Sequence, residues 1–306
     1  MTAYILRRLL VLVPTLIGVT IVVFVVTLFI PGDPALIMLG QQATEEQVEI
    51  LREDMRLDAP AHIRYFRWLN NILRGDFGRS LIDRRPVLPV LLRRFPATLQ
   101  LLFFGVVLST VIGIPAGIIC AVYPNTKLDA VARILSLIGV STPSFWFALL
   151  LLLLFSYHLR ILPMTGYQGW EYLILPGVAL GAQLIGLLTR LTRSTMMDKL
   201  QEDYIRTARS KGLAERVVLY KHTLRNAMLP LITIIGLRIG HLLGGTVVIE
   251  TVFDWPGIGR YAYTRMLQRD YPAIMANLLI FAFCFCIINL ITDILYGVFD
   301  PRIKYD

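Results

Sequence analysis

The sequence predicts an all-α integral membrane protein with six transmembrane helices. The 306-residue chain is 56% apolar and only 17% charged, whereas soluble domains are about a quarter charged. Its mean hydropathy is +0.65, and its apolar residues are gathered in blocks close to the length of about 20 residues that crosses a bilayer as a helix. This composition excludes a disordered chain, a disulfide scaffold and an ordinary cytosolic enzyme.

Six apolar blocks meet or approach the length of a membrane span. Five contain no Asp, Glu, Lys or Arg, and the remaining one is interrupted only by Arg238. In chain order they are Leu9–Gly32, Phe95–Thr126, Ile134–Leu159, Tyr172–Thr189, Asn226–Ile249 and Tyr271–Thr292. The first block could instead be a cleaved signal peptide. It is longer than a typical signal-peptide core and has no A-x-A cleavage site, so we expect a retained helix.

The placement of charge predicts the orientation in the membrane. The net charge is +9, and nine Lys or Arg residues lie between Arg190 and Arg225 against four acids. Arg7 and Arg8 precede the first block. The positive-inside rule therefore places both termini and the second and fourth connections in the cytoplasm. Nucleic-acid binding is the rival explanation for a basic chain, but the basic residues are distributed by side of the membrane, as expected for a multi-pass membrane protein.

The connection of residues 31–94 is expected to form a small helical extracytoplasmic segment. It opens with the turn sequence Pro31-Gly32-Asp33-Pro34, and Thr44 with Gln47 has the pattern of a capping box. Helical periodicity predicts helices over Glu45–Met55 and Ala61–Leu73, the second ended by Gly75-Asp76-Phe77-Gly78. Two interpretations remain open: a cap that packs on the membrane helices, or a surface that contacts a ligand.

The basic cytoplasmic connection, residues 190–225, predicts a helix that stops at a glycine and then restarts. Arg209 and Lys211 fall in a last helical turn, and Gly212 follows at the position where a left-handed residue ends a helix favourably. Such a helix–glycine–helix unit can present residues to a soluble partner. It can also be an amphipathic loop held at the lipid headgroups.

This connection resembles the EAA loop of bacterial ABC importer permeases, in the branch that carries oligopeptides, dipeptides, glutathione or nickel. The branch motif R-T-A-R-x-K-G is matched by Arg206 to Gly212, although Arg206-Thr207-Ala208 stands where the broader family has Glu-Ala-Ala and Arg225 where it often has proline. Further hallmarks of the branch are Pro31-Gly32-Asp33-Pro34, Gly75-Asp76-Phe77-Gly78, Glu250-Thr251-Val252-Phe253, Pro256-Gly257-Ile258-Gly259, Arg269-Asp270-Tyr271-Pro272 and Asp300-Pro301. The chain is most similar to glutathione and dipeptide permease subunits.

The resemblance implies a type I importer. A second homologous permease subunit would pair with this chain, two cytoplasmic ATPases would bind ATP and Mg, and an extracytoplasmic binding protein would deliver the solute. The resemblance also implies that the ATPase docks on Tyr204, Arg206, Thr207, Ala208, Arg209, Lys211, Gly212 and Leu213. The domain order would be an N-terminal helix (1–30), the extracytoplasmic segment (31–94), a permease core (95–292) that contains the loop, and a tail (293–306).

The residues themselves support a non-catalytic role. No G-x-x-x-x-G-K-[ST] phosphate-binding loop, H-E-x-x-H or G-x-S-x-G motif occurs. We expect Cys120, Cys284 and Cys286 to be packing residues rather than a disulfide or a metal site. The solute is expected to be a di- or oligopeptide or glutathione. The alternatives are nickel or another non-peptide solute, and a self-contained secondary transporter or channel, although no internal repeat supports the last.

Polar residues within the apolar blocks are the remaining candidates for function. Arg238 and His241 lie on one face of the fifth block, and charged groups inside a membrane usually face a bundle interior or a cavity. Asp293 is the candidate counter-ion. The series Gly236, Gly240 and Gly244 predicts close packing against another helix. Arg238 could therefore line a translocation route or form a structural contact between helices.

Overall fold

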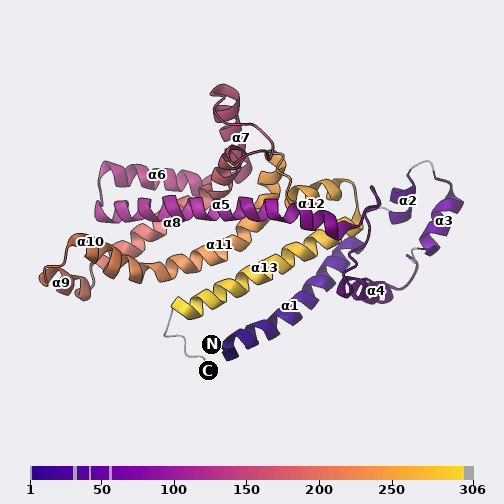
Figure 1. Ribbon diagram of the computed structural model, residues 1–306, viewed down its shortest axis with the longest axis horizontal. Helices are drawn as coiled ribbons and strands as arrows, with labels where there is room; N and C mark the ends of the chain where they lie inside the picture. The colour runs from indigo at the N-terminus through magenta and orange to yellow at the C-terminus, as the bar shows by residue number, and fades with distance from the viewer. Residues whose placement is uncertain (1, 30–32, 41–42, 55–56, 300–306) are drawn as a thin grey trace. The chain divides into compact units, whose positions relative to one another are not determined.

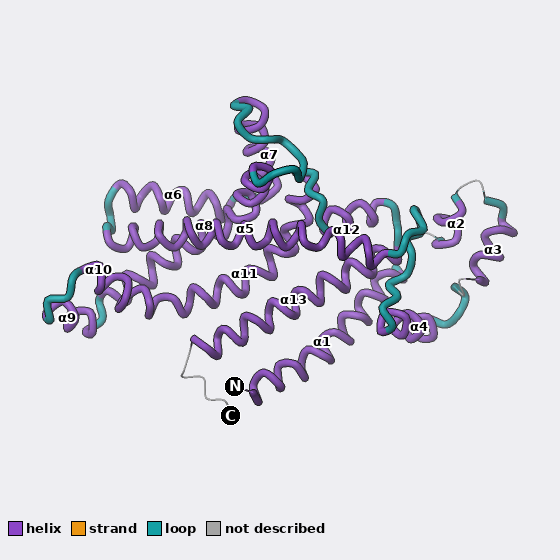
Figure 2. The backbone as a smooth tube through the Cα atoms, in the orientation of Figure 1, coloured by secondary structure: helices purple, strands orange, loops and turns teal. Residues whose placement is uncertain are grey.

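The computed structural model describes residues 2–29, 33–40, 43–54 and 57–299 (Figure 1). In these residues every regular element is helical, joined by loops (Figure 2), and Arg79 and Pro86 form one isolated β-bridge. The helices are α1 (Thr2–Leu28), α2 (Pro34–Leu39), α3 (Glu45–Asp54), α4 (Ala61–Leu73), α5 (Val87–Val122), α6 (Lys127–Ser141), α7 (Ser144–Leu151) continued by the π-helical η1 (Leu152–His158), α8 (Glu171–Leu200), α9 (Asp203–Ser210), α10 (Glu215–Val217) continued by the π-helical η2 (Val218–Leu224), α11 (Arg225–Val252), α12 (Ile258–Leu267) and α13 (Tyr271–Phe299).

The chain divides into two compact units. Unit 1 holds residues 99–255 and the chain from residue 288, and unit 2 holds residues 2–98 and 256–287. Among the described residues, five helical segments are long and apolar enough to cross a membrane: Leu10–Leu28, Val87–Val122, Glu171–Leu200, Glu215–Val252 and Tyr271–Thr292. They correspond to five of the six predicted spans.

The third predicted span, Ile134–Leu159, is not one continuous helix. α6 ends at Ser141, α7 starts at Ser144, and the two are bent by 112°. Pro143 causes the break, because proline cannot donate a backbone hydrogen bond and disfavours a helical conformation for Thr142 before it. Thr142 is extended accordingly, with ψ of 128°. A sixth span exists only if the bent pair is counted as one.

Glycines bring α5 and α8 together in unit 1. A Cβ added at Gly117 on α5 would lie 2.5 Å from Thr192 Cβ, and one added at Gly181 on α8 would lie 2.7 Å from Ser109 Oγ. The Ser109 hydroxyl donates across this seam to the Gly181 carbonyl at 3.0 Å. Helices surrounded by lipid gain little from the hydrophobic effect, so such close backbone approach is a main source of their association.

A buried ion pair joins α6 to α8 in the same unit. Asp129 is fully buried, and Arg193 donates to both of its carboxylate oxygens, from Nε at 2.6 Å and from Nη2 at 2.9 Å. The Asn125 backbone N–H donates a further bond to this carboxylate at 3.0 Å. Removing one partner of a buried pair leaves an uncompensated charge and costs about 3–5 kcal/mol.

In unit 2 the helix α4 packs on the C-terminal half of α1. α4 has the predicted bounds, and α3 begins as predicted, with Thr44 and Gln47 forming the capping box through bonds of 3.1 and 3.3 Å. The Phe24 ring on α1 makes an edge contact with Tyr65 of α4 at 5.4 Å, and the hydroxyls of Tyr65 and Thr20 are 2.8 Å apart. This packing supports the cap interpretation for α4.

One helix of unit 2 was not predicted. α2 starts at Pro34, and the Asp33 side chain caps it by accepting from the Ala35 N–H at 2.9 Å. Pro31, Gly32, Met55 and the Asp300-Pro301 motif, which the sequence interpretation used, lie outside the described residues.

Candidate functional sites

The predicted cytoplasmic loop is built around α9, which lies at one end of unit 1 (Figure 1). Ile205 and Ala208 are spaced one helical turn apart, and both are buried against Val218 of η2. Of the eight residues assigned to this loop by the resemblance, only Ala208 is buried. The other seven, Tyr204, Arg206, Thr207, Arg209, Lys211, Gly212 and Leu213, are exposed on the surface of the chain.

Gly212 ends α9 in the left-handed conformation, with φ of +75°. The Gly212 N–H donates to the Arg209 carbonyl at 2.9 Å, and the Leu213 N–H donates to the Ala208 carbonyl at 3.4 Å. These two bonds together form the Schellman motif that closes a helix C-terminus. An added Cβ at Gly212 would meet no heavy atom within 4 Å. The requirement for glycine is therefore one of backbone conformation and not of space.

An ion pair spans this turn and was not predicted. Arg209 donates to the two carboxylate oxygens of Glu215 at 2.6 and 3.2 Å. The hydrogen bond that Arg209 donates to Glu215 raises the pKa of the Arg209 guanidinium above its usual value. Both side chains are about half exposed, so the pair contributes at most about 1 kcal/mol. Its effect is to hold the start of α10 against the end of α9.

A small cavity lies in unit 1 at the break between α6 and α7. Its volume is about 160 Å³, and its lining includes Val140 and Ser144 from either side of the break, with Gln183, Arg238 and His241. The Gln183 amide donates to the Thr142 carbonyl at 3.1 Å. Non-helical backbone at membrane depth is tolerated only where it is buried in protein or lines a water-filled cavity. The break and the polar side chains therefore occur together for a physical reason.

Arg238 and His241 line this cavity side by side on α11, as their spacing indicated. Both are exposed in the isolated chain, and Arg238 has no ion pair with any residue in the described part of the chain. The side chain of Asp293 lies outside the described residues. Its role as the counter-ion of Arg238 stays a prediction.

The three glycines of α11 do not share one environment. A Cβ added at Gly236 would overlap Thr292 of α13, and Gly240 is buried. Gly244 is exposed and has no heavy atom within 4 Å of an added Cβ. The predicted packing role therefore does not extend to Gly244 within this chain. The neighbouring Gly245 instead approaches Leu180 of α8, at 3.6 Å.

Two of the hallmark motifs meet in unit 2, which the sequence interpretation did not anticipate. Asp270 is fully buried and accepts from the Ser80 hydroxyl at 2.5 Å and from the Leu81 N–H at 3.0 Å. A Cβ added at Gly78 would contact Pro272 at 3.4 Å. These contacts join the segment after Gly75-Asp76-Phe77-Gly78 to Arg269-Asp270-Tyr271-Pro272. The two motifs are about 190 residues apart in the chain, and no spacing in the sequence predicted that they meet.

No metal centre is formed in the described part of the chain. No group of three His, Cys, Asp or Glu side chains gathers there. Cys120 and Cys284 are buried free thiols, and Cys286 is partly buried.

Comparison with known proteins identifies the family. Residues 113–305 match the family described as "Binding-protein-dependent transport system inner membrane component", and residues 1–102 match its N-terminal companion family. The chain belongs to this family of importer permeases. It is 42% identical, over the full length of both chains, to the protein named glutathione transport system permease protein GsiC from Escherichia coli K12 and to that from Salmonella paratyphi A.

Solved structures of low sequence identity share the fold. An inward-facing structure of the MetNI methionine ABC transporter matches with a TM-score of 0.59 at 18% identity, covering 70% of this chain and 97% of that chain. An amino acid ABC transporter matches with a TM-score of 0.52 at 15% identity, covering 71% of this chain and 95% of that chain. The permease is thus a multi-pass inner-membrane transport subunit, and its family implies a binding protein and an ATPase as partners.

Replacing Gln183 by methionine should destabilise the break. The Thr142 carbonyl would lose its described donor, and the net contribution of one such hydrogen bond is about 0.5–1.5 kcal/mol. Thermal unfolding of the purified complex measures the loss. The matched control is Gln201→Met at the exposed end of α8, where we expect no shift. An equal shift in both variants would show that the bond from Gln183 does not stabilise the break.

Proposed function

We propose that this chain is one of two homologous permease subunits of an ATP-driven importer for glutathione or short peptides. The full-length similarity to permeases named for glutathione transport supports this solute class most directly. Import of nickel or another non-peptide solute is the second candidate, because the motif set belongs to a branch that includes it. A self-contained carrier is disfavoured by membership of a family described as binding-protein-dependent.

In this proposal both termini and the α9 loop lie in the cytoplasm. The concentration of basic residues between Arg190 and Arg225 supports that orientation. Two ATPases bind ATP and Mg outside this chain, and one of them docks on the exposed residues of α9 and its turn. The binding protein delivers the solute on the opposite, extracytoplasmic side of the membrane.

The contacts of α9 support a coupling between the ATPase and the solute. Ile205 and Ala208 are seated on Val218, which belongs to the helical stretch Glu215–Val252. That stretch carries Arg238 and His241 to the cavity beside the α6–α7 break. A displacement of α9 by the ATPase would thus be transmitted along one helical stretch to the residues that line the cavity.

The cavity residues suit an anionic solute group. A guanidinium can donate two parallel hydrogen bonds to a carboxylate, and both peptides and glutathione carry carboxylates. The competing role for Arg238 is a structural pair with Asp293. In that role Arg238 would hold α11 against α13 and would not contact the solute.

The coupling proposal predicts that Gly212→Val abolishes uptake. A β-branched residue is strongly disfavoured at a φ of +75°, so the end of α9 would be rebuilt. The subunit should still reach the membrane, but less ATPase should co-purify with it. Gly212→Asn is the matched control, because asparagine tolerates the left-handed conformation, and it should retain most of the uptake. Normal uptake by Gly212→Val would exclude the docking role.

Variants of Arg238 distinguish a contact with the solute from a structural pair with Asp293, and the uptake assay tests the proposed solute class. If Arg238 contacts a carboxylate, Arg238→Lys should reduce uptake of labelled glutathione or dipeptide about tenfold or more in an assembled complex, because the paired donor geometry is lost. If Arg238 is structural, Arg238→Ala should reduce assembly, and adding Asp293→Ala should restore part of it. Uptake of neither labelled solute by the parent complex would contradict the proposed solute class.

A further inference from the structure

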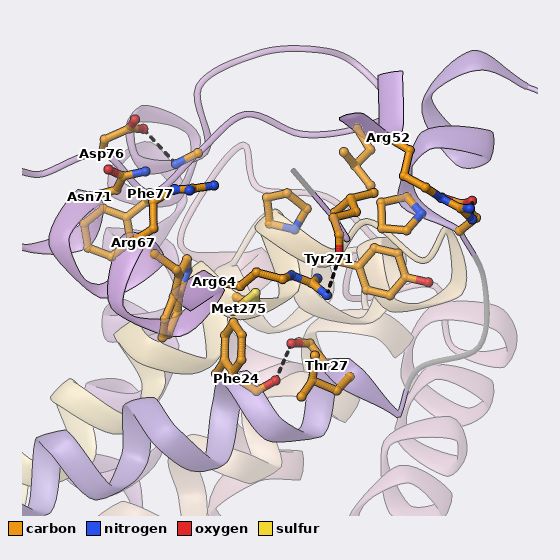
Figure 3. Close-up of a pocket in the computed structure, with 18 of the residues that line it drawn as sticks. Phe24, Thr27, Arg52, Arg64, Arg67, Asn71, Asp76, Phe77, Tyr271 and Met275 are labelled. Atoms are coloured by element: carbon orange, nitrogen blue, oxygen red, sulfur yellow. Dashed lines mark hydrogen bonds and ion pairs between the residues drawn. The ribbon is translucent and has the colours of Figure 1, made fainter. Parts of the chain in front are cut away.

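A larger cavity of about 780 Å³ lies within unit 2 (Figure 3). Its floor is formed by the last turns of α1, with Phe24 and Leu28, and by the first turn of α13, with Tyr271 and Met275. Its wall is formed by α4 and by the segment around α2 and α3. None of the residues assigned to coupling or transport lines it.

The residues of the floor indicate that this cavity lies at the membrane surface. Leu28 is the last residue of the apolar stretch Leu10–Leu28, and Tyr271 is the first of Tyr271–Thr292. Two membrane-spanning segments therefore end at the same cavity, where hydrocarbon gives way to headgroups. Trp68 and Tyr271 in its lining are of the residue types that gather at this boundary.

The charged side chains that line the cavity differ in whether they have an ion-pair partner. Arg52 is paired with Asp33 at 2.5 Å, and Asp58 adds to the negative field at the same guanidinium. Asp76 accepts from the Gly78 N–H in its own loop at 2.9 Å. The lining holds three arginines and three aspartates, and the other two arginines, Arg64 and Arg67, both lie on α4.

Neither arginine of α4 forms an ion pair with a carboxylate of the described residues. Arg64 extends across the cavity in Figure 3 and donates only to the Leu57 carbonyl, at 3.3 Å. Arg67 lines the cavity one turn along and has no hydrogen bond or ion pair with any other residue that the structure describes. Two guanidiniums thus face a cavity with an apolar floor and without a carboxylate partner among the described residues.

We propose that this cavity binds the phosphate of a phospholipid headgroup, held by Arg64 and Arg67. The guanidinium fork matches phosphate oxygens in geometry as well as in charge. The acyl chains would leave over the apolar floor of Phe24 and Met275, along α1 and α13. The bound lipid would hold α4 to the membrane surface at the end of α1. A soluble acidic segment would gain nothing from this apolar floor, so the lipid is the better fit.

Lipid titration of the purified complex tests this site. Phosphatidylglycerol is added to the delipidated complex in detergent, and bound lipid is counted by native mass spectrometry. Arg67→Gln should weaken binding about tenfold, since a charge-assisted hydrogen bond is lost, and Arg64→Gln should add to that loss. Arg74→Gln is the control: Arg74 ends the same helix, is exposed and does not line the cavity, so binding should be unchanged.

Three outcomes would overturn the assignment. Arg67→Gln and Arg74→Gln could bind phosphatidylglycerol equally well. Glycerol 3-phosphate could occupy the site as tightly as the lipid, which would make it a site for a soluble phosphate. Arg67→Gln could lose affinity for the binding protein and not for lipid, which would make the cavity a protein-docking site.

Discussion

Unit 1 depends on the fit of α8 against its neighbours. Helices in lipid are not driven together by the hydrophobic effect, so they must associate through close packing and polar contacts. α8 uses both. It meets α5 at the seam of Gly117 and Gly181, it meets α6 at the Asp129–Arg193 pair, and its Gln183 amide binds the backbone at the α6–α7 break.

The packing of α8 explains how polar side chains and non-helical backbone are accommodated at the α6–α7 break. With α8 fixed against both sides, the non-helical backbone around Thr142 is held in a defined position and its carbonyl is satisfied. The same cavity receives Arg238 and His241 from α11. The helical stretch Glu215–Val252 reaches from this cavity to the α9 contact at Val218. The turn at Gly212 and the polar cavity are therefore connected through one helical stretch of unit 1.

Local signals in the sequence predicted local structure well. Helical periodicity gave the bounds of α4, the Thr44 capping box gave the start of α3, and Gly212 gave the end of α9. The break was not predicted, because the absence of charge from Ile134 to Leu159 indicates one apolar span, whereas Pro143 inside that span interrupts the helix. Gly113 with Gly117 and Gly177 with Gly181 are also G-x-x-x-G pairs, and the α5–α8 seam is built on them. Contacts such as Asp129 with Arg193 and Asp270 with Ser80 join residues far apart in the chain, and no spacing rule in one sequence reveals them.

A disulfide that locks α9 to η2 tests the central claim most directly. Ile205 and Val218 are buried in one contact, and cysteines at both positions can be oxidised in a chain whose three native cysteines have been replaced by serine or alanine. If α9 and the helical stretch that begins at Glu215 move as one body, the oxidised complex should retain binding-protein-dependent uptake close to that of the reduced complex. Loss of uptake on oxidation, restored by reduction, would show that α9 must move independently of that helix and would contradict the account.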